Sequence, residues 1–468
     1  MWSCVIIVLF FSYLVTSQSI VEYLPGYPDK LPFTLETGYI GVGEQEEVQL
    51  FYYFIESERN PATDPLLLWL TGGPGCSALW SLTYEIGPLY FDYTASATRG
   101  NKPTLTLNPY SWTKVASIIF VDETAGTGFS YGTNEQAYNV SDTLAAEELC
   151  TFLRKWLISH PHFMNNPLYI AGDSYSGIII PQIVQKILNG NEIGTTPPLI
   201  LKGYILGNPF ADENIDFNSR VEFAYRVNLL SDELYVAAKE DCHGWYLYVD
   251  PSNEACISDL RAINDCLDKL FQPNVLEPNC ATVSPKPKDL NWDRRQLTMD
   301  LTDYIRPIPR AREPGPWCRQ DDYVYIYIWA NDKSVQDALH VRPGTIKTWS
   351  RCNKTLQDDY DYNVVSTLEI HRNLTASGRR VLIYSGDQDL IVPYVGTETW
   401  INSLNLTVDD VWTPWFVDGQ VAGYTQKFRN NTYTLTYATV KGAGHTAPEY
   451  KPKESLAMLT RWLAYYHL

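Results

Sequence analysis

The sequence Gly-Asp-Ser-Tyr-Ser-Gly at residues 172–177 follows the apolar run 167–171 and precedes the apolar stretch 178–183. This order predicts a strand, a tight turn and a helix, an arrangement that holds a nucleophilic serine on a strained turn. The usual pattern is Gly-x-Ser-x-Gly, whereas here serine fills the second small position and glycine follows it. Taken alone, the segment fits an ordinary turn with a capping serine equally well. Ser174 is therefore the candidate nucleophile, and it needs partners.

The candidate acid comes much later in the chain. The strand-like run 380–385 leads directly into Gly-Asp-Gln-Asp-Leu-Ile-Val-Pro at 386–393. Asp389 is favoured, because an aspartate three residues before the Val-Pro step is the usual place for the acid that orients an imidazole. Asp387 is the alternative.

The candidate base is His445, one of seven histidines. It follows a predicted strand at 434–440 and lies in a loop of small residues that lets the ring reach a distant serine. A serine hydroxyl is a poor nucleophile until a base within hydrogen-bond reach removes its proton, and a buried aspartate fixes the imidazole tautomer. Ser174, Asp389 and His445 also occur in the order nucleophile, acid, histidine that this architecture expects.

A glycine-rich loop completes the candidate site. The apolar run 66–70 is followed by Thr-Gly-Gly-Pro-Gly-Cys-Ser at 71–77, and glycines let backbone N–H groups approach a ligand atom closely. An oxyanion hole combines the amide after the nucleophile with one from an early strand-to-helix loop. The amides of Tyr175 and Gly73 are predicted to fill these roles.

These motifs together resemble the serine carboxypeptidase family, including its plant acyltransferase branch, over nearly the whole chain. The resemblance implies an α/β-hydrolase fold, in which helices flank a central mixed, mostly parallel sheet and a helical cap is inserted. The stretches that carry the likeness lie at 69–77, 172–177, 386–393 and 444–445, and those typical of the plant branch at 24–26, 35–39, 329–332 and 414–424.

The apolar pattern agrees with that fold. Runs typical of strands alternate with helix-like ones such as 142–158. The predicted strands in the first half are 48–55, 66–70, 115–121, 168–171 and 199–206.

The predicted organisation has a signal peptide at 1–19, a first part of the hydrolase core at 20–210, a cap insertion at 211–329 and a second core part at 330–468. Within the insertion, 284–314 is rich in Pro, Lys and Arg, which suits an exposed linker open to proteases. Many family members are cleaved there, so the chain is expected to be a monomer, or a two-chain heterodimer if the linker is cut.

Composition indicates the location of the protein and the partners it can have. The apolar N-terminal stretch predicts secretion, no later run is apolar enough to span a bilayer, and the expected location is the vacuole or the cell exterior. A net charge of −18 argues against nucleic acid as a partner. Sequons for glycosylation occur at Asn139, Asn353, Asn373, Asn405 and Asn430.

The sequence has nine cysteines, and loss of Cys4 with the signal leaves eight, an even number compatible with disulfides. No Cys-x-x-Cys pair or histidine cluster occurs, so no metal is expected, and no cofactor is implied. The resemblance implies three disulfides and leaves Cys150 and Cys266 free. The implied pairs are Cys76 with Cys352, Cys242 with Cys256, and Cys280 with Cys318.

The reaction depends on residues around the nucleophile. Carboxypeptidases of the family bind the substrate carboxylate with an Asn before the glycine loop and a Glu before the serine, where this chain has Thr71 and Asp173. A third member of that network is retained as Glu85. Loss of the asparagine amide removes a donor that could hydrogen-bond a carboxylate, and aspartate is one methylene shorter than glutamate, so this network would need a different geometry. With Gly72, these residues form the predicted substrate-binding set.

The resemblance then favours an acyltransferase that uses a 1-O-β-glucose ester as donor and an alcohol as acceptor, through an acyl-Ser174 intermediate. The alternative is a serine-type carboxypeptidase active at acid pH. A third reading, a catalytically inactive secreted binding protein, is disfavoured because every triad and oxyanion position is filled.

Overall fold

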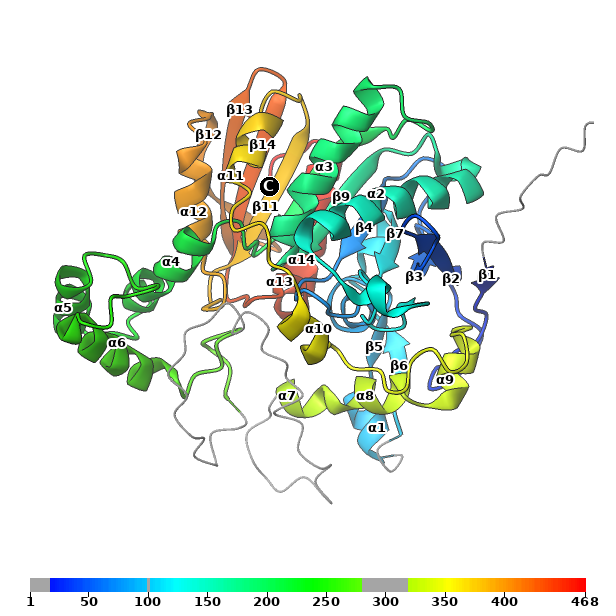
Figure 1. Cartoon of the computed structure of the whole chain (residues 1–468), viewed down its shortest axis with the longest axis horizontal. Coiled ribbons are helices and arrows are strands. Elements are labelled where there is room, and N and C mark those ends of the chain that lie inside the picture. The colour runs from blue at the N-terminus through cyan, green and yellow to red at the C-terminus, as the bar shows by residue number, and fades with distance from the viewer. Residues whose placement is uncertain (1–16, 99–101, 280–318) are drawn as a thin grey trace, which may run out of the picture.

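A computed structural model describes residues 17–98, 102–279 and 319–468, and it contains one large twisted sheet between layers of helices (Figure 1). From β7 to β14 every neighbouring pair of strands is parallel, and antiparallel strands extend both edges. The strand order is β1 (Ser17–Ile20), β2 (Leu35–Val42), β3 (Val48–Ile55), β7 (Ser117–Val121), β4 (Leu66–Leu70), β9 (Leu168–Asp173), β10 (Leu201–Gly207), β11 (Arg380–Gly386), β14 (Tyr433–Val440), β13 (Gln420–Asn430) and β12 (Thr407–Val417), with β8 (Tyr131–Gly132) beside β3.

Each face of the sheet carries its own hydrophobic core, because successive side chains of a strand point to opposite faces. On β4, Leu66 and Leu68 pack with α2 (Asp142–Ser159) and α3 (Ser176–Glu192), whereas Leu67 and Trp69 pack on the other side with α14 (Pro452–Leu463). The central strands are therefore apolar on both faces, as parallel strands covered by helices require. The architecture is an α/β-hydrolase fold.

The remaining short elements connect or cover this framework. They are β5 (Leu89–Phe91) paired with β6 (Leu105–Leu107), α1 (Tyr93–Thr98), α9 (Lys333–Ala338), α10 (Lys354–Asp359), α11 (Leu368–Leu374), α12 (Tyr394–Ser403) and α13 (Ala447–Tyr450).

The insertion predicted at 211–329 lies within the long connection between β10 and β11, and it is helical in its described part. It contains α4 (Glu213–Arg226), α5 (Asp232–Asp241), α6 (Glu254–Leu267), α7 (Arg319–Asp322) and α8 (Val324–Ala330). The α5–α6 hairpin extends away from the sheet (Figure 1). The predicted linker at 284–314 and the Cys280–Cys318 pair lie outside the described residues.

Most predicted strands occur with small shifts at their ends. The run predicted to begin at residue 115 forms β7 from Ser117, because Trp112–Lys114 closes a short 3₁₀ helix that ends at Val115. At the N-terminus, β1 pairs with β2 and overlaps the last residues of the predicted signal peptide. No helix in the described ranges is long and apolar enough to cross a membrane.

Candidate active site

The turn between β9 and α3 places Ser174 in the left-handed backbone region, with φ of +55°. Two positions that flank this turn, 172 and 177, must be glycine. A Cβ at Gly172 would lie 2.4 Å from the Leu70 carbonyl oxygen, and a Cβ at Gly177 would lie 2.4 Å from that of Phe210. The second glycine of the motif stands at 177 because the close backbone approach occurs there.

His445 joins the serine to a buried carboxylate. Its Nε2 lies 2.8 Å from Ser174 Oγ, and its Nδ1 lies 2.7 Å from Asp389 Oδ2. Asp389 is fully buried and accepts hydrogen bonds from Asn208 Nδ2 at 2.9 Å and from the Ile391 amide at 2.7 Å. These bonds fix the carboxylate that faces the imidazole.

The alternative acid has a different partner. Asp387 Oδ1 accepts a hydrogen bond from the Gly442 amide at 2.7 Å. The structure therefore joins Asp389, rather than Asp387, to the His445 ring.

A loop of the insertion supports both of these late segments. The carbonyl of Pro273 accepts a hydrogen bond from the His445 amide at 2.7 Å, and the carbonyl of Gln272 accepts one from the Leu390 amide at 3.0 Å. The Val275 amide in turn donates to the Gln388 carbonyl at 3.0 Å. The insertion thus contacts the loops of the acid and the histidine directly.

The glycine loop after β4 lies against the elbow. A Cβ on Gly72 would come within 2.5 Å of Ser174 Cβ and 2.9 Å of the Tyr175 nitrogen. Gly73 has a φ of +136°. The segments that carry the two predicted oxyanion amides, Gly73 and Tyr175, are therefore adjacent. The Tyr175 side chain points elsewhere, and its hydroxyl donates to Asp142 Oδ1 at 2.8 Å.

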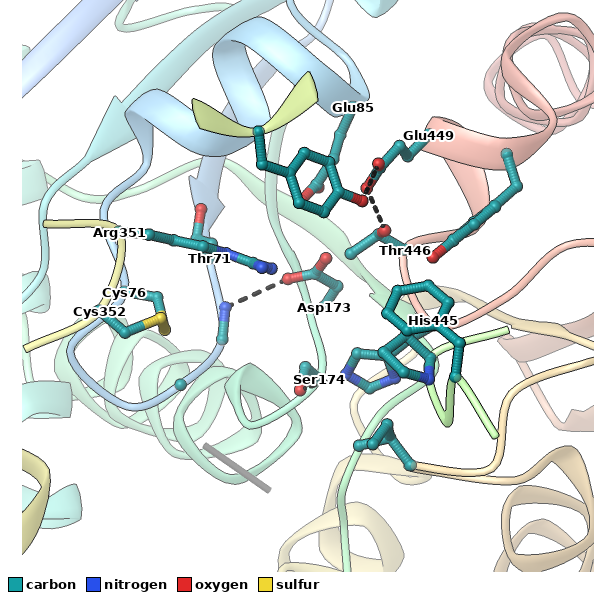
Figure 2. A pocket seen from close by; sticks show the side chains of 17 residues that line it. Thr71, Cys76, Glu85, Asp173, Ser174, Arg351, Cys352, His445, Thr446 and Glu449 are labelled. Atoms are coloured by element: carbon teal, nitrogen blue, oxygen red, sulfur yellow. Dashed lines mark hydrogen bonds between the residues drawn. A yellow bond between two sulfur atoms is a disulfide. The ribbon is translucent and has the colours of Figure 1, made fainter. Parts of the chain in front are cut away.

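Ser174 and His445 line a pocket together with the predicted substrate-binding residues (Figure 2). The lining residues used below are Thr71, Gly72, Gly73, Cys76, Glu85, Asp173, Tyr323, Arg351, Cys352, Thr446 and Glu449.

Two buried carboxyls form one wall of this pocket. Asp173 Oδ1 accepts a hydrogen bond from the Gly72 amide at 3.1 Å. In the part of the chain that the structure describes, Asp173 Oδ2 and both Glu85 carboxyl oxygens lack a partner with hydrogen-bond geometry. Burial raises the pKa of both groups, and the charge of Asp173 raises that of Glu85 further. The pair therefore keeps a proton well above the usual range of a carboxyl.

The Thr71 side chain is engaged away from the carboxyls. Its hydroxyl lies 2.8 Å from Ser81 Oγ. The Thr71 hydroxyl therefore forms a hydrogen bond with the Ser81 hydroxyl.

Arg351 is a pocket residue that the sequence reasoning missed. Its guanidinium lies 3.6 Å from the centre of the Trp80 ring, and its side chain points toward Asp173 (Figure 2). Arg351 directly precedes Cys352, so the disulfide implied between Cys352 and the glycine loop was the signal that could have located it.

Glu449, a second missed residue, organises the opposite wall. Its carboxylate accepts hydrogen bonds from the Tyr323 hydroxyl at 2.5 Å and the Thr446 hydroxyl at 2.8 Å, and Arg319 lies 3.6 Å away. Glu449 follows His445 by only four residues, but nothing local in the sequence predicts that Tyr323, on the insertion, reaches it.

The structure forms two of the implied disulfides, Cys76–Cys352 and Cys242–Cys256. Within the described ranges neither Cys150, which is buried, nor Cys266, which is exposed, forms a disulfide. In the described ranges no group of three or more His, Cys, Asp or Glu side chains could hold a metal ion.

The fold and the Ser174–His445–Asp389 geometry define the class of α/β-hydrolases, and comparison with known proteins narrows it. The serine carboxypeptidase family model matches residues 25–465. Serine carboxypeptidase-like 2 of Arabidopsis thaliana is 45% identical over 453 residues, covering 96% of this chain and 93% of that relative. Serine carboxypeptidase-like 16 of the same plant is 46% identical over 448 residues, covering 96% and 94%. The chain belongs to the serine carboxypeptidase family.

A solved structure shares the fold at low identity. The prohormone-processing carboxypeptidase Kex1(delta)p of Saccharomyces cerevisiae superposes with a TM-score of 0.74 at 21% identity, covering 95% of each chain. This likeness concerns the architecture alone.

Proposed function

We propose that this protein is an acyltransferase that moves an acyl group from a 1-O-β-glucose ester to an acceptor alcohol. In this proposal Ser174, His445 and Asp389 form the catalytic triad, and the amides of Gly73 and Tyr175 form the oxyanion hole. No cofactor takes part.

The proposed reaction has two steps. Ser174 Oγ attacks the ester carbonyl while His445 Nε2 takes its proton, and the two amides bind the tetrahedral oxyanion. The C–O bond to glucose then breaks, and glucose leaves with the proton from His445. In the second step His445 removes the proton of the acceptor alcohol, which attacks the acyl-Ser174 carbonyl. Its proton passes to Ser174 as the new ester departs.

The observation that carries this proposal is the chemistry of the carboxyl wall. Among the described residues, Asp173 Oδ2 and the two Glu85 carboxyl oxygens have no partner with good hydrogen-bond geometry, and carboxyl oxygens are good acceptors for sugar or alcohol hydroxyls. The neutral asparagine amide that helps peptidases of the family to bind a carboxylate is replaced by Thr71, whose hydroxyl contacts Ser81. Buried oxygen acceptors beside the nucleophile suit a polyhydroxylated leaving group better than an anion.

Arg351 favours the second candidate, a serine carboxypeptidase. Its Nε is buried and has no hydrogen-bond partner among the described residues, so the guanidinium could bind the terminal carboxylate of a peptide. The same cation could instead bind a carboxylate on an acceptor alcohol. Assays with both classes of substrate distinguish the acyltransferase from the carboxypeptidase.

The test uses the purified protein with two substrate sets at pH 5. One set is sinapoyl glucose or another acyl glucose with a panel of alcohols, including hydroxy acids, and the other is N-blocked dipeptides. We expect a new ester that depends on acceptor concentration, and no product from Ser174→Ala. Release of C-terminal amino acids without any transferred ester would establish the peptidase instead.

The proposal includes the location of the protein in the cell. We infer entry into the secretory pathway, consistent with the two disulfides, and a final location in the vacuole or outside the cell. The signal peptide, the glycosylation and cleavage of the linker are tested by N-terminal sequencing and mass spectrometry of the mature protein.

A further inference from the structure

We propose that Gln357 is a positioning residue, which fixes the backbone of the glycine loop so that the Gly73 amide points at the reacting centre. The inference rests on the proposed oxyanion role of Gly73. It does not depend on the identity of the acyl donor or acceptor.

One distant segment, 351–357, contacts the glycine loop at four successive residues, 74–77. The Ser77 amide donates to the Arg351 carbonyl at 2.7 Å, and the Asn353 amide donates to the Gly75 carbonyl at 3.1 Å. The disulfide described above joins the two segments between these bonds (Figure 2). The two stretches thus pair like a short antiparallel ladder.

Gln357 continues this contact toward Gly73. It lies on α10, has 3% of its surface exposed, and its Nε2 donates to the Pro74 carbonyl at 2.7 Å. Asn353 begins the same helix, and its side chain accepts the Leu356 amide as an N-cap. Since Pro74 directly follows Gly73, the Gln357 bond is the contact of this segment closest to the proposed oxyanion amide.

The loop needs such a restraint because of its conformation. Gly73 and Gly75 have φ values of +136° and +75°, and glycine has access to many other conformations. An oxyanion donor acts only within about 2.7–3.1 Å of the developing charge, so a tilt of the Gly73 peptide weakens it. Gln357 does not line the pocket, and it acts through the loop alone.

The experiment measures how fast a fluorophosphonate probe labels Ser174 in the full-length protein. Ser174 Oγ forms a bond to phosphorus, fluoride leaves, and the serine proton passes to His445. Charge develops on the phosphoryl oxygen, so the rate reports the same oxyanion hole. For Gln357→Leu we expect the maximal labelling rate to fall about tenfold, less than for direct loss of a donor, with the concentration of probe at half-maximal rate unchanged.

Asn166 provides a matched control. It is 2% exposed, and its Nδ2 donates to the carbonyls of Pro61 at 2.8 Å and Asp64 at 2.7 Å, on the loop that enters β4 at the opposite end from the site. Asn166→Leu removes comparable buried bonds. We expect it to lower the melting temperature and to leave the labelling rate within about twofold of the wild type, because the oxyanion loop is untouched.

If Gln357→Leu does not fold, a second pair of variants tests the same hydrogen bond. In Gln357→Glu, a protonated carboxyl can still donate to the Pro74 carbonyl, whereas an ionised one cannot. We expect near wild-type labelling at pH 5 and a falling ratio to wild type as the pH rises to 8. Asn166→Asp should show no such trend in its ratio.

The results separate the two proposals. Wild-type labelling rates in both Gln357 variants, or equal losses in the Asn166 variants, would overturn the positioning role. Normal labelling of the wild type without acyl transfer would refute the proposed function and leave the role of Gln357 intact.

Discussion

Around Ser174, close contacts with neighbouring carbonyl oxygens determine which residue each position of the elbow tolerates. The elbow tolerates a serine at 176, whose hydroxyl donates to the Leu70 carbonyl at 3.2 Å, but a methyl group at Gly177 would overlap the Phe210 carbonyl. The position of each small residue therefore follows from the backbone that passes it. The motif departs from Gly-x-Ser-x-Gly without losing the strained serine.

The choice between the two candidate acids gives a direct prediction. Asp389→Asn should lower the rate of fluorophosphonate labelling by about 10³–10⁴-fold, because an amide favours the wrong imidazole tautomer. Asp387→Asn keeps an oxygen for the Gly442 amide and should stay within about threefold of wild type. The measurement is the labelling time course of both variants. A large loss for Asp387→Asn alone would reverse the assignment.

The sequons differ in accessibility, which predicts their occupancy. Asn353 Nδ2 donates to the Gly126 carbonyl at 2.9 Å, and the residue is half-buried. A glycan on that nitrogen would break this contact beside the glycine loop. We therefore expect mass spectrometry of the folded protein to find Asn353 unmodified. The other four sequons are exposed, and high occupancy at Asn353 would contradict the described packing.

At the scale of elements, the two disulfides have different expected effects. Cys242–Cys256 closes a stretch of 14 residues between α5 and α6, so its removal should cost about 3 kcal/mol of hairpin stability without changing Ser174 labelling. Replacing Cys76 and Cys352 by serine should slow labelling as well, because that bond restrains the glycine loop. Labelling rates and thermal melts of the two double variants test this. Equal labelling in both would argue against a role for the loop restraint.

Local sequence patterns were sufficient to predict most strands of the hydrophobic core. β3 and β4 match their predicted ends, since unbroken apolar runs bounded by turn residues define a buried strand. The triad residues could be selected because each follows such a strand. Glu449 and Tyr323 could not, because their contact depends on how the insertion packs across the site, which no local sequence pattern encodes. Arg351 could be located only indirectly, through the implied disulfide of its neighbour Cys352.

The whole molecule carries several buried carboxyls that hold their protons unusually well. Burial raises the pKa of Asp122 to about 7 and that of Glu123 to about 8, and it raises Glu148 and Asp216 to about 7. The unfolded chain releases these protons near pH 4. Between those limits the native state binds more protons than the unfolded state, so stability falls as the pH rises.

We therefore expect the melting temperature to be higher at pH 5 than at pH 8. Glu123 is the sharpest probe, because its Oε2 has no hydrogen-bond partner among the described residues and Asp142 is close. Glu123→Gln should melt like the wild type at pH 5 and above it at pH 8, since the amide cannot ionise. Scanning fluorimetry across this range measures both proteins. A wild-type melting temperature that rises with pH would refute the expectation.

The contact between the insertion and the two late loops limits how the protein can be engineered. Residues 272–275 belong to the insertion by sequence, yet their backbone holds the histidine and acid loops. A chimera that exchanges whole caps between relatives would replace this support with a foreign one. Crossover points placed before residue 271 keep the native support, so an exchange confined to the α5–α6 hairpin leaves the histidine and acid loops in place.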